Sequence, residues 1–184
     1  MVYTLKHSMN TSKSEILIKE CLRGNKKSQK ELFDTYKNAM FTVCLRITAN
    51  EEDAKDALQE GFIAVFNGLH SFKSKSTIGA WIKTIMVRTA LRKVRKIWFE
   101  DVEDIKNVSV EFDSDFTGEM LHNAIMQLDD GYRTVFVLFE VEGYSHREIA
   151  KITGISEGTS KSQLHYAKKK LKSIIVNHYE YERR

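Results

Sequence analysis

Residues 145–164 read SHREIAKITGISEGTSKSQL, with signals for two short helices and the turn between them. Ser145 and Glu148 have the spacing of a capping box, in which the hydroxyl and the carboxylate each satisfy a backbone amide at a helix start. Gly154 can supply a left-handed turn, and Ser156 is suited to cap the helix that follows. The stretch therefore predicts a helix-turn-helix.

The second of these helices carries side chains suited to reading a major groove. Ala150 is small where the two helices would cross, and Ile149, Ile155 and Leu164 can form a small core between them. Groups that hydrogen-bond or stack cover the first turns, namely Ser156, Thr159, Lys161, Ser162, His165 and Tyr166. The lysines that follow suit phosphate contacts, namely Lys168, Lys169, Lys170 and Lys172. The alternative is a helical hairpin with a solvated lysine tail, but the capping box, Gly154 and Ala150 together favour a helix-turn-helix.

Helical periodicity continues on the N-terminal side of this motif. Apolar residues at helical spacing predict helices over 121–128 and 132–141, with a break and cap at 129–131. Residues 99–117 have no sustained period, and from Glu100 to Glu119 there are eight acids against Lys106 alone. This composition predicts a flexible linker.

The N-terminal half predicts three helices. One covers 31–47, and a second follows Asn50, which reads as an N-cap with acids in the first turn, and continues to Leu69. A polar loop over 71–77 leads into a third helix that ends near Lys96.

The third of these helices is basic and has two faces. From Trp81 to Trp98 there are six basic residues and no acid. On a helical wheel the apolar residues gather on one side, while Trp81 and Ile85 lie among the cations of the other, which are Arg88, Arg92, Arg95 and Lys96. Apolar side chains among arginines suit stacking on bases. Alternatively, Trp81 packs under the preceding loop and the arginines only keep the helix soluble.

The composition narrows the class of protein. The 184 residues include no proline and nine glycines, which favours an all-α fold of two small domains, residues 1–98 and 119–184, joined by an acidic linker at 99–118. No apolar run could span a bilayer and no signal peptide begins the chain, so we expect a cytoplasmic protein without membrane insertion. Cys21 and Cys44 are expected to be free thiols. We find no metal spacing, phosphate loop or nucleophile motif, and therefore expect no enzyme activity, cofactor, metal or small-molecule substrate.

Both halves together resemble the extracytoplasmic-function group of bacterial sigma factors, over roughly residues 28–175. Glu31-Leu32-Phe33 through Tyr36 is similar to the opening of the family's region two, and residues 53–62 (DAKDALQEGF) to its most recognisable stretch. Tyr132-Arg133, Glu148-Ile149-Ala150 and residues 158–164 (GTSKSQL) resemble region four and its recognition helix. Ser160 and Gln163 depart from the family's common valine and arginine.

The resemblance implies partners and sites. Core RNA polymerase would dock on Asp53, Asp56, Gln59, Glu60 and Phe62. The minus-ten promoter element would be captured and melted by Lys73, Lys75, Ser76, Trp81, Lys83, Arg88, Arg92, Arg95 and Lys96. The minus-thirty-five element would be read by Ser156, Thr159, Lys161, Ser162, His165, Tyr166, Lys168 and Lys169. An anti-sigma factor is a further candidate partner.

Two hypotheses of different class follow from these observations. The first is a sigma factor that binds core polymerase and promoter DNA. The second is a standalone helix-turn-helix regulator whose N-terminal half is a dimerisation or sensor domain, which predicts tight duplex binding without polymerase and a palindromic site. Without the resemblance, the acids of residues 53–60 would simply be a polar helix face.

Overall fold

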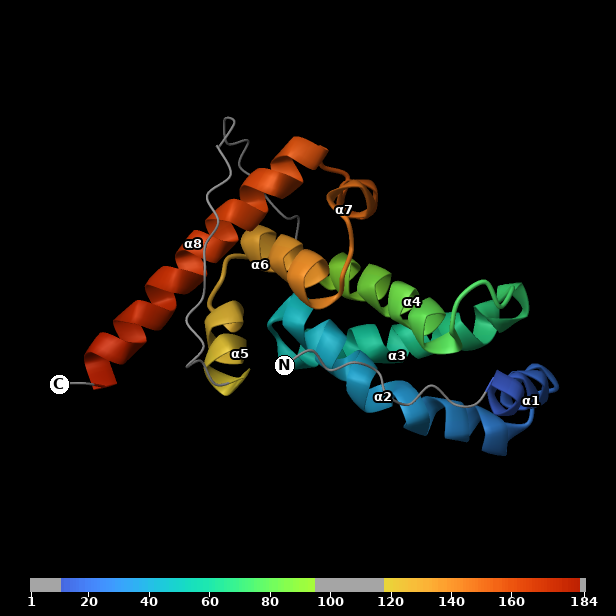
Figure 1. The fold of residues 1–184 in the computed structure, drawn as a ribbon. Coiled ribbons are helices and arrows are strands. Elements are labelled where there is room, and N and C mark those ends of the chain that lie inside the picture. The colour runs from blue at the N-terminus through green and yellow to red at the C-terminus, as the bar shows by residue number, and fades with distance from the viewer. Residues whose placement is uncertain (1–10, 95–117, 183–184) are drawn as a thin grey trace. The chain divides into compact units, whose positions relative to one another are not determined.

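The computed structural model describes residues 11–94 and 118–182, and every regular element in these two ranges is a helix (Figure 1). This confirms the predicted all-α fold. Contacts between Cα atoms divide the chain near Val94 into two compact units, which we call the N-terminal unit and the C-terminal unit. The predicted acidic linker lies almost entirely outside the described residues.

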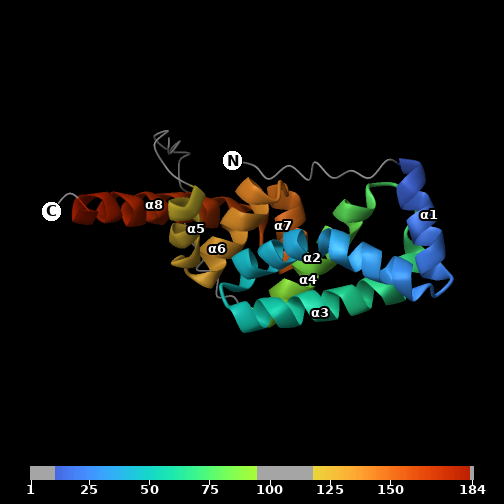
Figure 2. The same cartoon turned by 90° about the horizontal axis from the view of Figure 1, so that it is seen from below.

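The N-terminal unit is built on three long helices. They are α2 (Lys26–Thr48), α3 (Glu51–Gly68) and α4 (Ile78–Lys93), which pack lengthwise against one another (Figure 2). A short 3-10 turn, η1 (Leu69–Ser71), ends α3. The core between the helices is apolar, with Leu32, Met40, Ile47, Val65, Ile82 and Met86 all at most 1 % exposed. Burial of these side chains stabilises the unit by about 1.5–3 kcal/mol each.

A helix that the sequence patterns did not predict precedes this core. It is α1 (Thr11–Leu22), which lies against α2 and η1. Leu17 and Cys21, four residues apart, are its buried contacts, whereas Ile16 and Leu22 are exposed. Its apolar residues therefore do not form one stripe, and a search for helical periodicity misses it.

The helix starts of this unit follow the capping chemistry of the sequence. The Asn50 side chain accepts the amide of Asp53 at 3.0 Å, as predicted, and Thr77 caps α4 through the amide of Ala80. Asn25 caps α2, which begins at Lys26 rather than at the predicted residue 31. Ala49 ends α2 in the left-handed region, with φ of 49°.

A glycine sets the distance between α3 and α4. Gly61 is buried, and a side chain there would collide with the thioether of Met86 and approach Thr89 Oγ1 to 3.2 Å. The missing side chain lets the two helices approach closely. The residue next to it, Glu60, consequently lies within reach of cations on α4.

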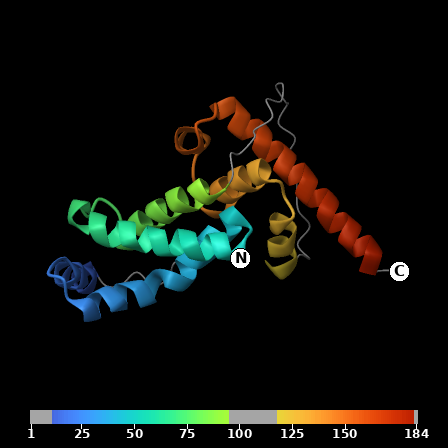
Figure 3. The ribbon, with the colours of Figure 1, turned by 180° about the vertical axis from the view of Figure 1, so that it is seen from behind.

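The C-terminal unit contains the predicted helix-turn-helix. Its elements are α5 (Gly118–Met126), α6 (Asp130–Phe136), η2 (Val137–Val141), α7 (His146–Thr153) and α8 (Glu157–Glu182), and α5 and α6 both pack against α8 (Figure 3). Both capping-box bonds of Ser145 and Glu148 are present, Gly154 has φ of 79°, and Ser156 Oγ accepts the amide of Thr159. These three features confirm the predicted motif.

The region between α5 and α7 differs from the expectation in two ways. The helix predicted over 132–141 is α-helical only to Phe136 and continues as the π-helix η2, in which the Glu142 amide bonds to the Val137 carbonyl. Asp129 makes no side-chain cap for α6, because its carboxylate pairs instead with Lys170 of α8. The break at 129–131 is therefore confirmed, and Asp129 is the N-cap residue of α6 by its backbone but makes no side-chain cap bond.

Both cysteines are buried free thiols, as predicted. Desolvation raises the pKa of Cys44 to about 12 and also raises the pKa of Cys21. Within 11–94 and 118–182 there is no helix long and apolar enough to cross a membrane.

Candidate nucleic-acid interface

The outer face of α3 carries the predicted docking acids. Asp56, Gln59 and Glu60 are exposed, and Asp53 is half-buried one turn nearer the helix start. Spacings of three and four residues place these four side chains on neighbouring turns of one surface. This surface is hereafter the α3 face.

Phe62 does not lie on the α3 face. Its side chain is 3 % exposed, and its ring lies 4.7 Å from the ring of Phe33 and 6.2 Å from that of Phe66, measured between centroids. A partner could not touch it without opening the core, so we remove Phe62 from the predicted docking set. The phenylalanine is a packing residue whose side chain points inward.

Ile63, which the prediction omitted, lies on the α3 face in its place. It is 56 % exposed, three residues after Glu60 and four after Gln59. The helical spacing alone could have found it, because the positions that follow Gln59 and Glu60 by one turn share their surface. The α3 face thus combines acids with one large apolar side chain.

The loop before α4 is ordered by its aromatic residues. The ring of Phe72 lies 5.5 Å from that of Trp81, and the Trp81 indole also lies against Gly68, with both aromatic side chains half-buried. This is the packing that the alternative interpretation of Trp81 expected. The polar residues predicted to meet DNA, Lys73, Lys75 and Ser76, are exposed on the same loop.

The cations of α4 have different surroundings. Arg88 and Arg92 are exposed, and Lys83 is half-buried. The predicted contacts Arg95 and Lys96 lie outside the described residues. Arg88 lies one turn before Arg92, so the two guanidinium groups share one side of the helix.

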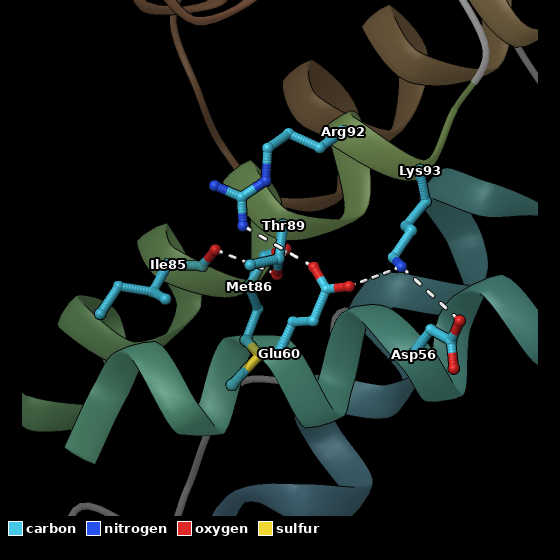
Figure 4. A network of polar contacts seen from close by, with 7 residues as sticks. All are labelled: Asp56, Glu60, Ile85, Met86, Thr89, Arg92 and Lys93. Atoms are coloured by element: carbon cyan, nitrogen blue, oxygen red, sulfur yellow. Dashed lines mark hydrogen bonds and ion pairs between the residues drawn. The ribbon is translucent and has the colours of Figure 1, made fainter. Parts of the chain in front are cut away.

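The end of α4 meets the α3 face in a network of ion pairs, which Figure 4 shows from close by. Lys93 Nζ lies 2.7 Å from Glu60 Oε1 and 3.6 Å from Asp56 Oδ2. Arg92 Nη2 lies 4.0 Å from Glu60 Oε2. The bond from Lys93 lowers the pKa of Glu60, and the same bond raises the pKa of Lys93. Lys93 was not a predicted site residue, since sequence alone does not show which acids a cation will meet.

On α8, one line of side chains points away from the core. Lys161, Lys169 and Lys172 are exposed and His165 is half-buried, and these four recur at steps of four, four and three residues. The opposite side is buried and includes Ser160, Gln163, Leu164 and Ala167. We call the outward line the α8 stripe.

The other predicted contacts of α8 are engaged within the protein. Ser162 is 7 % exposed and donates to the Thr159 carbonyl, and the hydroxyls of Ser156 and Thr159 lie 2.8 Å apart. The Tyr166 ring lies 6.1 Å from that of Tyr132, and Lys168 pairs with Glu140 at 2.7 Å. These side chains have partners within the protein that stabilise α8 and its junction with α6.

A histidine joins α7 to α8. The His146 ring stacks on Phe139 with centroids 4.3 Å apart, and its Nδ1 lies 2.9 Å from the buried Oγ of Ser160. Desolvation, followed by the charge of Lys161, lowers the pKa of His146. Ser160, which departs from the family's usual valine, therefore has a structural partner here.

No group of three or more histidine, cysteine or acidic residues in the described parts of the chain could hold a metal ion.

Comparison with known proteins gives matches in both units. Residues 32–100 match the family model described as Sigma-70 region 2, and residues 118–171 match Sigma-70, region 4. The RNA polymerase sigma factor SigV of Bacillus subtilis is 31 % identical over 73 % of this chain and 82 % of its own length. The ECF RNA polymerase sigma factor SigW of the same species is 26 % identical, over 88 % of this chain and 98 % of that protein.

Solved structures share the fold. A chain in the co-crystal structure of the sigma factor RpoE with the anti-sigma factor NepR from Bartonella quintana matches with a TM-score of 0.54 at 21 % identity, over 79 % of this chain and 95 % of that chain. A chain in the structure of CnrH with the cytosolic domain of CnrY matches with a TM-score of 0.51 at 22 % identity, over 89 % of this chain and 97 % of that chain.

Proposed function

The chain belongs to the sigma-70 family of RNA polymerase sigma factors and to its extracytoplasmic-function group, and from this premise we propose how its surfaces divide the recognition of a promoter. As a sigma factor it binds core RNA polymerase and promoter DNA and directs initiation, without a catalytic step of its own. The observation that carries this function is the presence of both sigma-70 regions in order, one in each unit.

The match to sigma region 2 also removes the support for the hypothesis of a standalone regulator. That hypothesis needed a dimerisation or sensor domain in the N-terminal half, and this half matches sigma region 2 instead.

We assign core polymerase to the α3 face. Asp53, Asp56, Gln59 and Glu60 would form a polar rim around the exposed side chain of Ile63. A rim of one charge sign steers association with a basic partner, and an apolar anchor inside it supplies much of the binding energy. The partner surface is therefore basic with an apolar pocket.

We assign the minus-ten element to the loop at 73–76 and to α4. Unstacking a base costs a few kcal/mol per step, which phosphate contacts can offset. Lys73 and Lys75 on the loop, with Lys83, Arg88 and Arg92 on α4, are the cations proposed for these contacts. Arg95 and Lys96 remain in this set from the sequence alone.

We assign the minus-thirty-five element to the start of α8. Lys161 and His165 of the α8 stripe are the proposed base readers, with Lys169 on phosphate. Each good base contact contributes about 1–3 kcal/mol of discrimination. Ser156, Thr159, Ser162, Tyr166 and Lys168 would act mainly by fixing α8, because their side chains already have partners in the protein.

An anti-sigma factor is a proposed second partner of the same surfaces. RpoE and CnrH were each solved with a partner, NepR and the cytosolic domain of CnrY respectively. An inhibitor that covers the α3 face or α4 would prevent core docking or DNA capture. The proposed site of action is the cytoplasm, where bacterial polymerase and chromosome lie.

Binding to core RNA polymerase tests this function. The wild-type chain should form a complex, and Asp56→Arg with Glu60→Arg should abolish it with an unchanged far-ultraviolet circular dichroism spectrum. Because arginines there would also repel Lys93, the isosteric pair Asp56→Asn with Glu60→Gln is the milder test, and it should weaken the complex at least tenfold.

A matched control is Glu15→Arg with Glu31→Arg, which makes the same change of charge at exposed positions on α1 and α2. This variant should bind core polymerase nearly as well as the wild type. A wild-type chain that ignores core polymerase but binds duplex DNA tightly by itself would overturn the proposed function.

A further inference from the structure

A buried polar contact joins the start of α8 to α7. His146, the first residue of α7, places its Nδ1 2.9 Å from Oγ of Ser160, a completely buried serine of α8. The same ring stacks on Phe139 of η2, with centroids 4.3 Å apart. One side chain therefore ties together three elements, η2, α7 and α8.

This contact lies one residue before the first cation of the α8 stripe. Lys161, which we assigned to base reading, is exposed, whereas its neighbour Ser160 faces the core. Successive residues of a helix point about 100° apart, so whatever fixes the direction of Ser160 also fixes that of Lys161. A rotation of α8 that broke the bond to His146 would turn Lys161 away from the bases.

The π-helical turn η2 supports this contact from below and fastens α8 a second time. Phe139 stacks on His146, and the next residue, Glu140, pairs with Lys168 of α8 at 2.7 Å. A π-helical turn within a helix frequently marks a functional position. Here two consecutive residues of η2 hold α8 at points about two turns apart, at Ser160 through His146 and at Lys168 directly.

The surroundings of the His146 ring favour its neutral form. Burial is the main cause that lowers its pKa, and the charges of Lys161 and Lys168 act in the same direction. The charges of Glu157 and Glu140 oppose them without outweighing them. A protonated ring has a hydrogen on both nitrogens and can no longer accept a hydrogen bond. The neutral contact is therefore complete above the ordinary pKa of 6.5 and is lost as pH falls through the lowered value.

We propose that His146 is a positioning residue for reading the minus-thirty-five element, which holds the start of α8 while neutral and releases it when protonated, so that promoter affinity falls as the pH is lowered. This inference rests on the function proposed above, in which Lys161 meets the major groove. The family's common valine at position 160 has no hydroxyl for such a bond, so the response depends on Ser160 of this chain. The expected loss is roughly two- to fivefold, the effect of one ordinary hydrogen bond.

The test measures binding of the full-length protein, in complex with core polymerase, to a promoter found by run-off transcription, at pH 7.5 and at pH 5.5. His146→Asn is the main variant, because its side-chain amide can take the place of Nδ1 against Ser160 and does not titrate. The ratio of wild-type to variant affinity cancels the pH responses of polymerase and DNA, and that of His165, whose protonation would strengthen phosphate binding. We expect a ratio near one at pH 7.5 and a roughly two- to fivefold lower ratio at pH 5.5.

Two controls separate positioning from a loss of structure. His122→Asn removes a half-buried histidine of α5 in the same unit and should keep the wild-type pH response. On a promoter with a scrambled minus-thirty-five element, wild type and His146→Asn should bind equally at both pH values, because α8 then has no bases to read. A pH-dependent ratio that survives scrambling would overturn the positioning role.

A double-mutant cycle at pH 7.5 tests the bond itself. His146→Phe keeps a ring on Phe139 without the nitrogen, and Ser160→Ala removes the hydroxyl, so each should weaken promoter binding roughly two- to fivefold. Together they should weaken it little more than either alone, because both remove the same bond. Circular dichroism checks that each variant is folded, and losses that simply add would overturn positioning through Ser160.

The scrambled promoter also distinguishes this failure from that of the proposed function. If scrambling weakens wild-type binding but the affinity ratio is the same at both pH values, only the role of His146 is wrong. If scrambling has no effect at pH 7.5, α8 does not read this element, and the minus-thirty-five assignment and the inference fall together.

Discussion

The basic helices α4 and α8 differ in which acids neutralise them. The cations at the end of α4 meet Glu60 and Asp56, which belong to a second proposed binding surface. On α8, Lys168 and Lys170 meet Glu140 and Asp129, which anchor the helix to its own unit. Two similar runs of positive charge in the sequence thus have different roles. The cations of α4 pair with acids of another proposed binding surface, whereas two lysines of α8 hold that helix against its own unit. The number of cations overstates the number available to DNA in both.

The largest expected effect is a difference in promoter affinity between variants of the exposed lysines of α8 and variants of its ion-paired lysines. Lys161→Gln should lower affinity for the cognate promoter about tenfold, because Lys161 lies exposed in the first turns of the recognition helix. Lys170→Gln should change it less than about twofold, since Lys170 already pairs with Asp129 and lies over the Tyr132 ring. Binding of the polymerase complex to a promoter found by run-off transcription measures both.

For stability we expect the opposite ranking, with Lys170→Gln the more destabilising variant. It removes the contact to Asp129, whereas Lys161→Gln removes no ion pair among the described residues. Equal losses of DNA affinity in the two variants would contradict the proposed difference between the exposed lysines of the α8 stripe and the lysines of α8 that pair with acids.

Two left-handed helix ends, one in each unit, give the next largest effect, with opposite signs. Gly154→Ala should destabilise the C-terminal unit by about 1 kcal/mol, because a Cβ at φ of 79° strains the backbone although it would meet no neighbour. Ala49→Gly should stabilise the N-terminal unit by about the same amount, because Ala49 has φ of 49°. Hydrogen exchange of α2 and α7 amides in each variant reports the two units separately, and changes of the same sign would contradict the prediction.

Two buried threonines give a smaller contrast. Thr134 in the C-terminal unit is fully buried, and its hydroxyl has no hydrogen-bond partner among the described residues. Thr134→Val should therefore stabilise that unit by up to about 1 kcal/mol. The Thr89 hydroxyl donates to the carbonyls of Met86 and Ile85, so Thr89→Val should cost the N-terminal unit about 0.5–1 kcal/mol. Urea denaturation curves give both values.

The smallest effect is a pH dependence of the C-terminal unit between pH 7.5 and pH 5. Burial lowers the pKa of His146, so the unfolded chain binds a proton more readily than the folded one. The resulting stability is complete above the ordinary pKa of 6.5 and is lost as pH falls through the lowered value. The protection factors of α7 amides, in which the intrinsic pH dependence of exchange is divided out, should therefore fall between pH 7.5 and pH 5, and His146→Gln should remove that dependence. A wild-type slope that survives in the variant would assign the effect to another group.

Much of the fold could be predicted because its signals are local. Asn50, Ser145, Gly154 and Ser156 bond to backbone groups within three or four residues, so their chemistry is legible in the sequence. The helix α1 could not be predicted, because only Leu17 and Cys21 among its apolar residues are buried. The π-helical turn was also missed, since its wide turn accompanies the stacking of Phe139 on His146, a contact between separate elements.

The candidate site was predicted less completely, for the same physical reason. The helical wheel placed Arg88 and Arg92 outward correctly, because periodicity decides exposure on a single helix. It could not show that Lys93 would meet Glu60, thirty-three residues away, or that Lys170 would meet Asp129, forty-one residues away. Phe62 was assigned from a motif rather than from its wheel position, and its ring faces the core.

The indole of Trp81 lies against Phe72 and Gly68, beside the exposed lysines of the loop. Its ultraviolet emission is therefore an intrinsic reporter of that loop, sensitive to any base that displaces the phenyl ring or quenches the excited state. With Trp98→Phe to leave one emitter, stopped-flow mixing would time the arrival of a strand with no attached dye.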